Sequence, residues 1–256
     1  MSEVLRERRG HVEIITINRP EARNAINGAV SRGVGGALDE IETDDDCWVV
    51  ILTGAGDKAF SAGMDLKAFA AGEVADIAGA SGGFGGITQR DFPKPIIAAL
   101  NGSALAGGCE IMLSCDLVVA VEEAKIAITE VKRGLIAGAG GLIRLPRRLP
   151  RAVALELALT GEPLDAGRAL ALGLINRVVP AGRLMDEALA LAEVIAANAP
   201  LAVRTTKRVM KEALEVPEAE GWGINNSALS AVFASADAME GSRAFAEKRA
   251  PNWMGK

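Results

Sequence analysis

The sequence contains no tyrosine and a single histidine, His11, which lies beside the start of a strand-like segment. A histidine-based catalytic triad or a histidine-rich metal site is therefore disfavoured, and we expect His11 at the surface or at a strand edge. Acid–base chemistry must then be carried out by carboxylates, lysines or cysteines. The six phenylalanines and three tryptophans leave few aromatic platforms for the sugar of a two-carboxylate glycosidase.

Cysteines and long apolar runs are also scarce. The three cysteines are odd in number and form no C-x-x-C pair, a pattern that suits a reducing compartment. No uncharged apolar run reaches about 18 residues, so we expect no membrane span. The charged segment Met1–Gly10 has no apolar core of the kind found in secretory signals. These features together favour a cytoplasmic protein without a membrane partner.

Positive charge is not in excess, since the formal net charge is −5. A general nucleic-acid binder normally shows a basic field, so we expect no nucleic-acid partner. The local basic cluster Arg144–Arg151 is typical of a solvated surface, although it could also meet phosphates. Half of the residues are apolar and a quarter are charged, which is the balance of an ordinary globular protein with a sizeable core.

Short apolar segments alternate with helical patterns through the first two thirds of the chain. Continuous apolar runs bounded by turn residues are typical of strands buried on both faces. The pattern predicts a helix over 27–41, where apolar residues recur at helical spacing. Strands followed by helices indicate an α/β layered fold with mainly parallel pairing. The predicted strands cover residues 12–17, 48–52, 95–100, 117–121 and 124–129.

After about residue 149 the strand signals fade, and the pattern predicts helices over 152–159, 165–172, 184–198, 201–214 and 225–249. We therefore divide the chain into a core, residues 1–195, and a helical C-terminal region, residues 196–256. Such a helical appendage often packs against a neighbouring subunit. The glycine- and alanine-rich stretch 70–88 is interpreted as a mobile loop, which at this length is usually functional or disordered.

Two turns rich in small residues, 60–66 and 101–110, would let backbone approach a ligand closely. A helix starting near Gly107 would present free N–H groups to an anion. Alone, these glycines also fit tight turns. Glu110 alone fits a helix-dipole partner, and Glu130 alone fits a solvated carboxylate.

Taken together, these segments match one family in order and spacing, and the sequence resembles the crotonase (enoyl-CoA hydratase/isomerase) superfamily over nearly its whole length. The matching segments are Asn18-Arg-Pro, Asn24-Ala-Ile, Ile51-Leu-Thr-Gly54, Phe60-Ser-Ala-Gly-Met-Asp-Leu66, Pro95-Ile-Ile-Ala-Ala, Asn101-Gly to Glu110, Cys115-Asp116, Gly138-Ala-Gly-Gly141, Leu159-Thr-Gly161, Ala171-Leu-Gly-Leu-Ile-Asn-Arg177 and Ala244-Phe-Ala-Glu-Lys-Arg249.

The resemblance implies an α/β fold, a crotonase-like spiral of ββα units with a helical C-terminal region for trimerisation and site closure. It further implies homotrimers that pair into hexamers, an acyl-CoA substrate, and no metal or cofactor apart from the coenzyme A of the substrate. The backbone amides matched to the family's oxyanion hole are those of Met64 and Gly107. Fixed donors there would stabilise the enolate-like oxygen of a polarised thioester.

In hydratases of this family two glutamates hold one water, and they correspond here to Glu110 and Glu130. We assign activation of water to Glu110 and delivery of the Cα proton to Glu130. An apolar pocket would raise a carboxyl pKa toward neutrality, as an acid at pH 7 requires. Because isomerases can work with the Glu130-type residue alone, the presence of both favours an enoyl-CoA hydratase, a hydro-lyase that gives 3-hydroxyacyl-CoA.

An isomerase of the same superfamily is the main alternative, and an RNA-binding relative is disfavoured by the acidic charge. The ending Ala-Glu-Lys-Arg-Ala-Pro-Asn-Trp-Met-Gly-Lys also resembles the crotonobetainyl-CoA hydratase (carnitinyl-CoA dehydratase) branch. Its quaternary ammonium substrate would favour aromatic or acidic walls. From the family match, the residues expected to contact substrate or CoA are Arg23, Ala25, Ile26, Ala62, Asp65, Leu66, Lys67 and, from a neighbouring subunit, Phe245 and Lys248.

Overall fold

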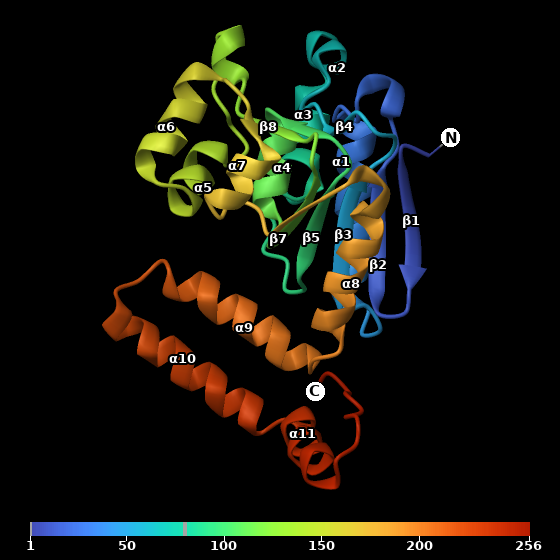
Figure 1. The fold of residues 1–256 in the computed structure, drawn as a ribbon, viewed down its shortest axis with the longest axis vertical. Coiled ribbons are helices and arrows are strands. Elements are labelled where there is room, and N and C mark those ends of the chain that lie inside the picture. The colour runs from blue at the N-terminus through green and yellow to red at the C-terminus, as the bar shows by residue number, and fades with distance from the viewer. Residues whose placement is uncertain (1, 79–80) are drawn as a thin grey trace.

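A computed structural model describes residues 2–78 and 81–256, and its centre is a six-stranded sheet (Figure 1). The strand order is β1-β2-β3-β5-β7-β10, and every neighbouring pair is parallel except the antiparallel hairpin of β1 and β2. Long parallel strands must be joined by crossovers, which the helices supply. The strands are β1 (Val4–Arg9), β2 (Val12–Ile17), β3 (Val49–Gly54), β5 (Ile96–Leu100), β7 (Leu117–Val121) and β10 (Arg177–Val179).

A smaller four-stranded sheet, in the order β4-β6-β8-β9, follows the same progression along the chain. In chain order, β4 follows β3, β6 follows β5 and β8 follows β7, so strands of the smaller sheet alternate with strands of the larger one. The strands are β4 (Ala59–Ser61), β6 (Ser103–Leu105), β8 (Lys125–Ala127) and β9 (Leu164–Asp165). This alternation of two sheets with intervening helices is the layered α/β architecture predicted from the sequence.

Helices cover the sheets and supply most of the remaining core. The α-helices are α1 (Gly28–Thr43), α2 (Leu66–Ala70), α3 (Val74–Ala78), α4 (Gly107–Ser114), α5 (Gly141–Arg148), α6 (Arg151–Thr160), α7 (Ala166–Ala171), α8 (Leu184–Ala196), α9 (Pro200–Ala213), α10 (Glu218–Phe233) and α11 (Ala236–Glu247). Within residues 2–78 and 81–256 there are also four short 3-10 helices: η1 (Pro20–Ala22), η2 (Phe84–Gly86), η3 (Glu130–Arg133) and η4 (Ala181–Arg183).

Helix α1 illustrates how the sequence specifies these elements. The Asn27 side chain accepts a hydrogen bond from the Val30 amide at 2.9 Å, which satisfies one free N–H of the first turn. Val30, Val34 and Leu38 then recur at helical spacing and are fully buried against the core. Helix α8 packs across β2, β3, β5 and β7. This helix ends at Ala196, and the division of the chain after residue 195 stays a prediction.

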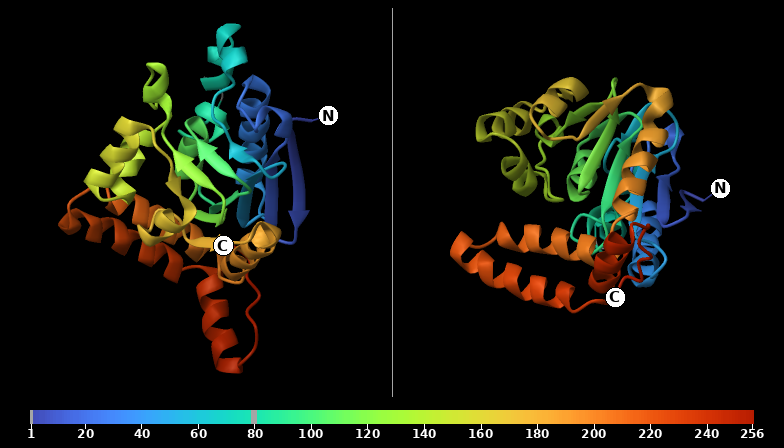
Figure 2. Two further views of the ribbon diagram at one scale, coloured as in Figure 1. Left: turned by 45° about the horizontal axis from the view of Figure 1, so that its top comes forward. Right: turned by 60° about the horizontal axis from the view of Figure 1, so that its bottom comes forward.

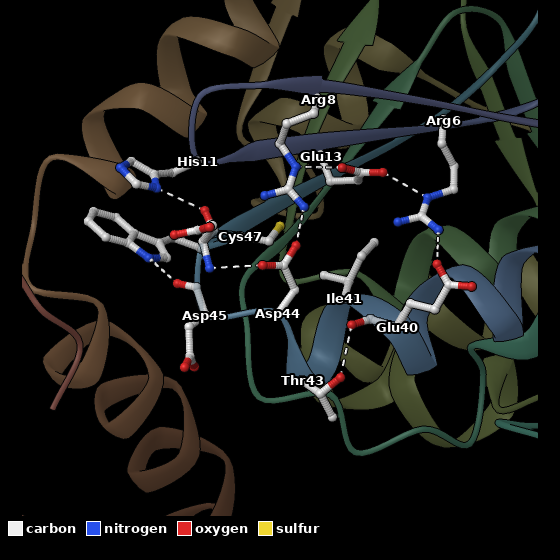
Figure 3. A network of polar contacts seen from close by, with 12 residues as sticks. Arg6, Arg8, His11, Glu13, Glu40, Ile41, Thr43, Asp44, Asp45 and Cys47 are labelled. Carbon is white, nitrogen blue, oxygen red and sulfur yellow. Dashed lines mark hydrogen bonds and ion pairs between the residues drawn. The ribbon is translucent and has the colours of Figure 1, made fainter.

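The hairpin of β1 and β2 escaped the sequence patterns because β1 carries mostly charged residues. Two of its arginines donate to one buried carboxylate, as Figure 3 shows. Glu13 accepts from Arg6 at 2.8 Å and from Arg8 at 2.6 Å. The same two guanidinium groups also bind Glu40 and Asp44 on and after α1. A buried carboxylate needs such paired donors, so this network fastens the edge of the sheet to α1.

His11 lies in the turn of that hairpin and is exposed, as expected from the sequence. Its ring stacks on the Trp48 indole with centroids 3.6 Å apart, and Nδ1 lies 2.8 Å from the Asp46 carbonyl oxygen. These contacts are structural, so the histidine takes no part in the candidate chemistry.

The interpretation of 70–88 as a loop was wrong for most of its described residues. It contains α3 and η2, and Phe84 is 8% exposed. Gly86 packs so closely on α1 that a Cβ atom there would lie 2.4 Å from the Gly35 amide nitrogen. Small residues here serve close packing rather than mobility. Residues 79 and 80 of this stretch lie outside the described residues.

The C-terminal helices α9 to α11 extend away from the two sheets (Figure 1, Figure 2). Helix α9 is tied to the core by Lys207, which donates to the Lys94 carbonyl at 2.8 Å and to Asp116 at 2.7 Å. The single helix predicted over 225–249 was wrong. Helix α10 starts earlier and ends at Phe233, and the Ser235 hydroxyl caps α11 by accepting from Ala238 at 3.1 Å.

In the described part of the chain, no single helix has the length and apolar composition needed to cross a bilayer. One bent pair, 181–196 with 200–213, meets both criteria jointly, but its two helices form an angle of 101°.

Candidate active site

The start of α4 forms the centre of the candidate site. Ala106 holds a positive φ of 51°, an unusual value for a residue with a side chain, and it turns the chain from β6 into the helix. Gly107 is the first helical residue, so its N–H has no partner within the helix. Among the described residues, the Gly107 amide donates no hydrogen bond. This amide is one of the two donors predicted for an oxyanion hole.

The other predicted donor is the Met64 amide. The residue before it, Gly63, packs against Gly107. Gly63 has a φ of 87°, and a Cβ atom there would lie 2.8 Å from the Gly107 nitrogen. Only glycine allows both the backbone conformation and this close approach. The Met64 N–H likewise donates to no other described residue. The structure thus places Gly63, the residue before the Met64 amide, against Gly107, while the role of the two amides as an oxyanion hole stays a prediction.

The two segments predicted to hold coenzyme A lie side by side through backbone hydrogen bonds. The Ala62 amide donates to the Arg23 carbonyl at 3.0 Å, and the Asp65 amide donates to the Ile26 carbonyl at 2.9 Å. A short parallel bridge joins Ile26 to Met64. Residues 23–26 and 62–65 therefore form one continuous ledge beside the oxyanion-hole amides, with Ala25 buried within it.

Asp65 and the two residues that follow it begin helix α2. The Asp65 carboxylate accepts from the Lys67 amide at 3.0 Å and pairs with Arg19 at 2.9 Å. Burial would raise the pKa of Asp65, but the Arg19 guanidinium and the α2 amides hold that pKa below its ordinary value. Its charge is therefore used within the fold. Leu66 is half exposed and Lys67 is exposed, so both face outward from the ledge.

A hollow of about 300 Å³ opens next to this ledge. It is lined by residues 20, 21, 23, 24 and 55–59, where the positive charges of Arg23 and Lys58 are matched by two carboxylates, Glu21 and Asp57.

Glu110 lies in the first turn of α4 and is 3% exposed. One oxygen, Oε1, accepts from the Ala139 amide at 2.7 Å and from the Gly141 amide at 2.8 Å. Burial raises the pKa of Glu110, the Gly141 amide opposes that rise, and the charge of Glu130 adds to it. The segment 138–141 therefore fixes this carboxylate through two backbone amides.

Glu130 stands at the start of η3, directly after β8, and its environment is different. Burial raises the pKa of this carboxyl above its ordinary value. Its Oε2 atom is buried and has no hydrogen-bond partner among the described residues. An unpartnered buried oxygen is costly, so such an atom in a site is suited to a bound substrate or water.

The two glutamates share one neighbourhood. The negative charge of Glu130 raises the pKa of Glu110, and both charges contribute to raising the pKa of the buried thiol of Cys109, after burial itself. The structure therefore brings the two predicted catalytic carboxyls together at the start of α4, one held by two amides and one left with a free oxygen.

Two further residues of the site were missed by the sequence analysis. The Phe84 ring packs on the start of α4, where a Cβ atom on Gly107 would lie 2.6 Å from two ring carbons. Arg144 donates to the Ala139 carbonyl at 3.2 Å, beside the Glu110 carboxylate. Phe84 stands in a glycine-rich stretch that resembled a loop, and Arg144 belongs to a cluster typical of a solvated surface.

Phe245 and Lys248, by contrast, do not approach the site within one chain. Both belong to the α11 segment, which lies at the opposite end of the molecule from α2 (Figure 1). Phe245 is 88% exposed, and Lys248 ends α11 with a positive φ of 54°. Among the described residues, no three His, Cys, Asp or Glu side chains are arranged to hold a metal ion.

Two backbone amides and two carboxyls, one buried and one partly buried, thus make up the candidate site, and known proteins share this fold. The enoyl-CoA hydratase/isomerase family matches residues 7–256. A carnitinyl-CoA dehydratase of Salmonella typhi is 43% identical over 262 residues, which cover both chains in full.

Solved structures give the same result. An enoyl-CoA hydratase from Mycobacterium tuberculosis H37Rv superposes with a TM-score of 0.96 at 51% identity. A carnitinyl-CoA hydratase from Mycobacterium avium has a TM-score of 0.80 at 50% identity, and both structures are covered in full, as is this chain. This chain belongs to the enoyl-CoA hydratase/isomerase family. The resemblance, the crotonase-type fold and the hydratase class of enzyme predicted from the sequence are confirmed.

Proposed function

We propose that this chain is an enoyl-CoA hydratase that adds water across the 2,3 double bond of an enoyl-CoA thioester, with Glu110 and Glu130 as its acid–base pair. The observation that carries the proposal is the contrast between the two buried carboxyls. Glu110 has one oxygen fixed by two amides, and Glu130 has a buried oxygen with no partner.

In this mechanism the thioester carbonyl oxygen accepts from the Met64 and Gly107 amides. Negative charge grows on that oxygen as water adds to Cβ, and fixed donors stabilise the enolate without reorganising. Each donor lowers the barrier by about 3 kcal/mol. Because both donors are backbone groups, the side chain at position 64 is free to vary, and the tight packing at Gly63 and Gly107 keeps them in place.

The carboxyls then divide the proton transfers. Ionised Glu110 removes a proton from the attacking water as the C–O bond forms at Cβ, and protonated Glu130 delivers a proton to Cα. The product is a 3-hydroxyacyl-CoA, and both carboxyls must exchange one proton to return to their starting forms. Burial raises the pKa of Glu130 above its ordinary value, which is the direction that a general acid requires.

Binding of the coenzyme A part completes the proposal. The ledge 23–26 and 62–67 would hold the pantetheine arm, and Arg23 at the adjacent hollow would meet phosphates. Phe245 and Lys248 would contact the nucleotide bound by a neighbouring subunit of a homotrimer, or of a hexamer formed from two trimers. Their exposure on α11 is consistent with a role outside their own chain. No cofactor is required besides the coenzyme A of the substrate.

The acyl group distinguishes two candidates. The 43% identity to carnitinyl-CoA dehydratases favours a crotonobetainyl-CoA substrate as the second candidate. A quaternary ammonium prefers aromatic or acidic walls. The aromatic ring found beside the oxyanion-hole amides is that of Phe84, which packs on Gly107. One such ring does not form a cage, so a short or medium enoyl-CoA remains the preferred substrate.

The test follows loss of the enoyl-thioester absorbance when the protein meets crotonyl-CoA, crotonobetainyl-CoA or a longer enoyl-CoA. Glu130→Gln is the control, and it should lower turnover by about 10³-fold because general acid catalysis is lost. Turnover by the wild type but not by the control supports the proposal and names the acyl class. Absence of turnover with all three substrates would contradict it and favour an isomerase of the same family.

A further inference from the structure

Arg144 occupies a position that neither a solvated surface nor a phosphate site explains. It lies in the first turn of α5 and is only partly exposed. Its Nη1 donates to the Ala139 carbonyl at 3.2 Å, and its Nη2 donates to the Thr88 carbonyl at 2.5 Å. One guanidinium therefore bridges two segments that are 51 residues apart in the chain, between positions 88 and 139.

The first of these segments is the turn that fixes Glu110. The Ala139 N–H donates to the Glu110 carboxylate at 2.7 Å, while the carbonyl of the same residue accepts from Arg144. The intervening Gly140 has a φ of 105°, and a Cβ atom there would lie 2.1 Å from Arg144 Nη1. The turn is thus wrapped around the guanidinium, which leaves no room for another residue at position 140.

The second segment carries a wall of the site. Thr88 is 1% exposed and follows η2, whose Phe84 ring packs against the Gly107 end of α4. A planar guanidinium with several donors in fixed directions is well suited to join two backbone carbonyls. The Arg144 side chain therefore links the 138–141 turn, which fixes Glu110, to the segment of Phe84 and Thr88 beside Gly107.

We propose that Arg144 is a positioning residue, which holds the 138–141 turn and with it the Glu110 carboxylate in the orientation needed to activate water. This inference rests on the proposed function of the site. The electrostatics are consistent with the geometry. Burial and the charge of Glu130 raise the pKa of Glu110, whereas the Arg144 charge opposes them. The other titratable groups whose charges act on Arg144 are Arg147, Arg148 and Cys115, and the Cys109 thiol interacts with both glutamates.

The test replaces Arg144 with methionine, which keeps much of its length but has neither donors nor charge. A displacement of about 1 Å at a catalytic group costs about 100-fold in rate, so kcat should fall by about this factor while KM stays nearly constant. Because the Arg144 charge lowers the pKa of Glu110, its removal should also move the acidic limb of the kcat/KM profile to higher pH.

Arg148→Met is the matched control. Arg148 lies one turn further along α5, is also partly exposed, and donates to the Cys115 carbonyl at 2.9 Å rather than to the site. It should leave the acidic limb in place. Arg144→Lys keeps the charge but not the fork, so it should lose kcat with little movement of the limb, and it provides a test if the methionine variant does not fold.

A readout independent of turnover separates this inference from the proposed function. The infrared carboxylic-acid band that differs between the wild type and Glu110→Gln reports ionisation of Glu110 directly. In Arg144→Met its midpoint should move to higher pH even if the protein hydrates none of the substrates tried. An unchanged midpoint and kcat, or an equal change in Arg148→Met, would overturn the role of Arg144.

Discussion

The core and the C-terminal region differ in how far their large apolar side chains are buried within the chain. Through 2–78 and 81–195, strands β2, β3, β5 and β7 of the large sheet are almost wholly buried, and Glu110 is enclosed by its own chain. In 196–256 the buried residues are few and mostly small, whereas large apolar side chains are exposed. These are Met210, Leu214, Trp222, Leu229, Phe233, Met239, Phe245 and Met254. Such exposed apolar side chains are consistent with the proposed contact with a neighbouring subunit.

This difference separates two tasks of the proposed enzyme. Every group that would touch the reacting atoms belongs to the core, so chemistry should depend on packing within one chain. Recognition of the coenzyme A handle, by contrast, is proposed to use α11 of a neighbouring subunit. Core substitutions should therefore change kcat, and substitutions on α11 should change KM.

The largest expected effect is that of Glu110→Gln in the core. The amide carbonyl of glutamine can still accept from the Ala139 and Gly141 amides, so the fold is retained. Glutamine cannot take a proton from water, and hydration should fall by about 10³-fold. Isomerisation of a 3-enoyl-CoA should survive, because Glu130 alone can move a proton. Full hydratase activity in this variant would show that Glu110 is not the base.

A smaller effect is expected from Gly141→Ala, which tests the turn rather than the carboxyl. The added methyl would lie 2.9 Å from Ile128 Cδ1 and 3.2 Å from Glu110 Oε1, so the carboxylate must shift. We expect kcat for hydration to fall by about 100-fold, with isomerisation less affected. Gly138→Ala is the control in the same turn, because a methyl there meets no atom within 4 Å. Equal losses in both variants would argue against a specific hold on Glu110.

The sequence predicted the elements whose signal is local. The apolar strands β3, β5 and β7 and the capped helix α1 were found to within two residues, because burial on both faces and 3.6-residue spacing are visible in short windows. The strand β1 was missed, because two of its arginines pair with the buried Glu13 of the neighbouring strand β2. That partner is not evident from β1 itself.

The site shows the same division between local and distant information. The amides of Met64 and Gly107 and the two glutamates were predicted as a set from the family resemblance, and their roles stay predictions. Phe84 and Arg144 could not be predicted, since each acts through a backbone group distant in the sequence. Phe84 lies in a glycine-rich stretch that is typical of a loop. Arg144 precedes three arginines in 147–151, a pattern that is typical of a solvated surface.

The smallest expected effect lies in the C-terminal region, where Lys248→Gln removes a charge proposed to meet the nucleotide phosphates in a neighbouring subunit. An interaction with this unreacting handle stabilises ground state and transition state equally, so KM for crotonyl-CoA should rise about tenfold at constant kcat. Crotonyl-pantetheine, which lacks the nucleotide, is the internal control, and its KM should be the same for the variant and the wild type. Phe245→Ala should behave likewise if its exposed ring covers the adenine. A fall in kcat with both substrates would instead place α11 in the assembly of the reacting site and remove the division between the two regions.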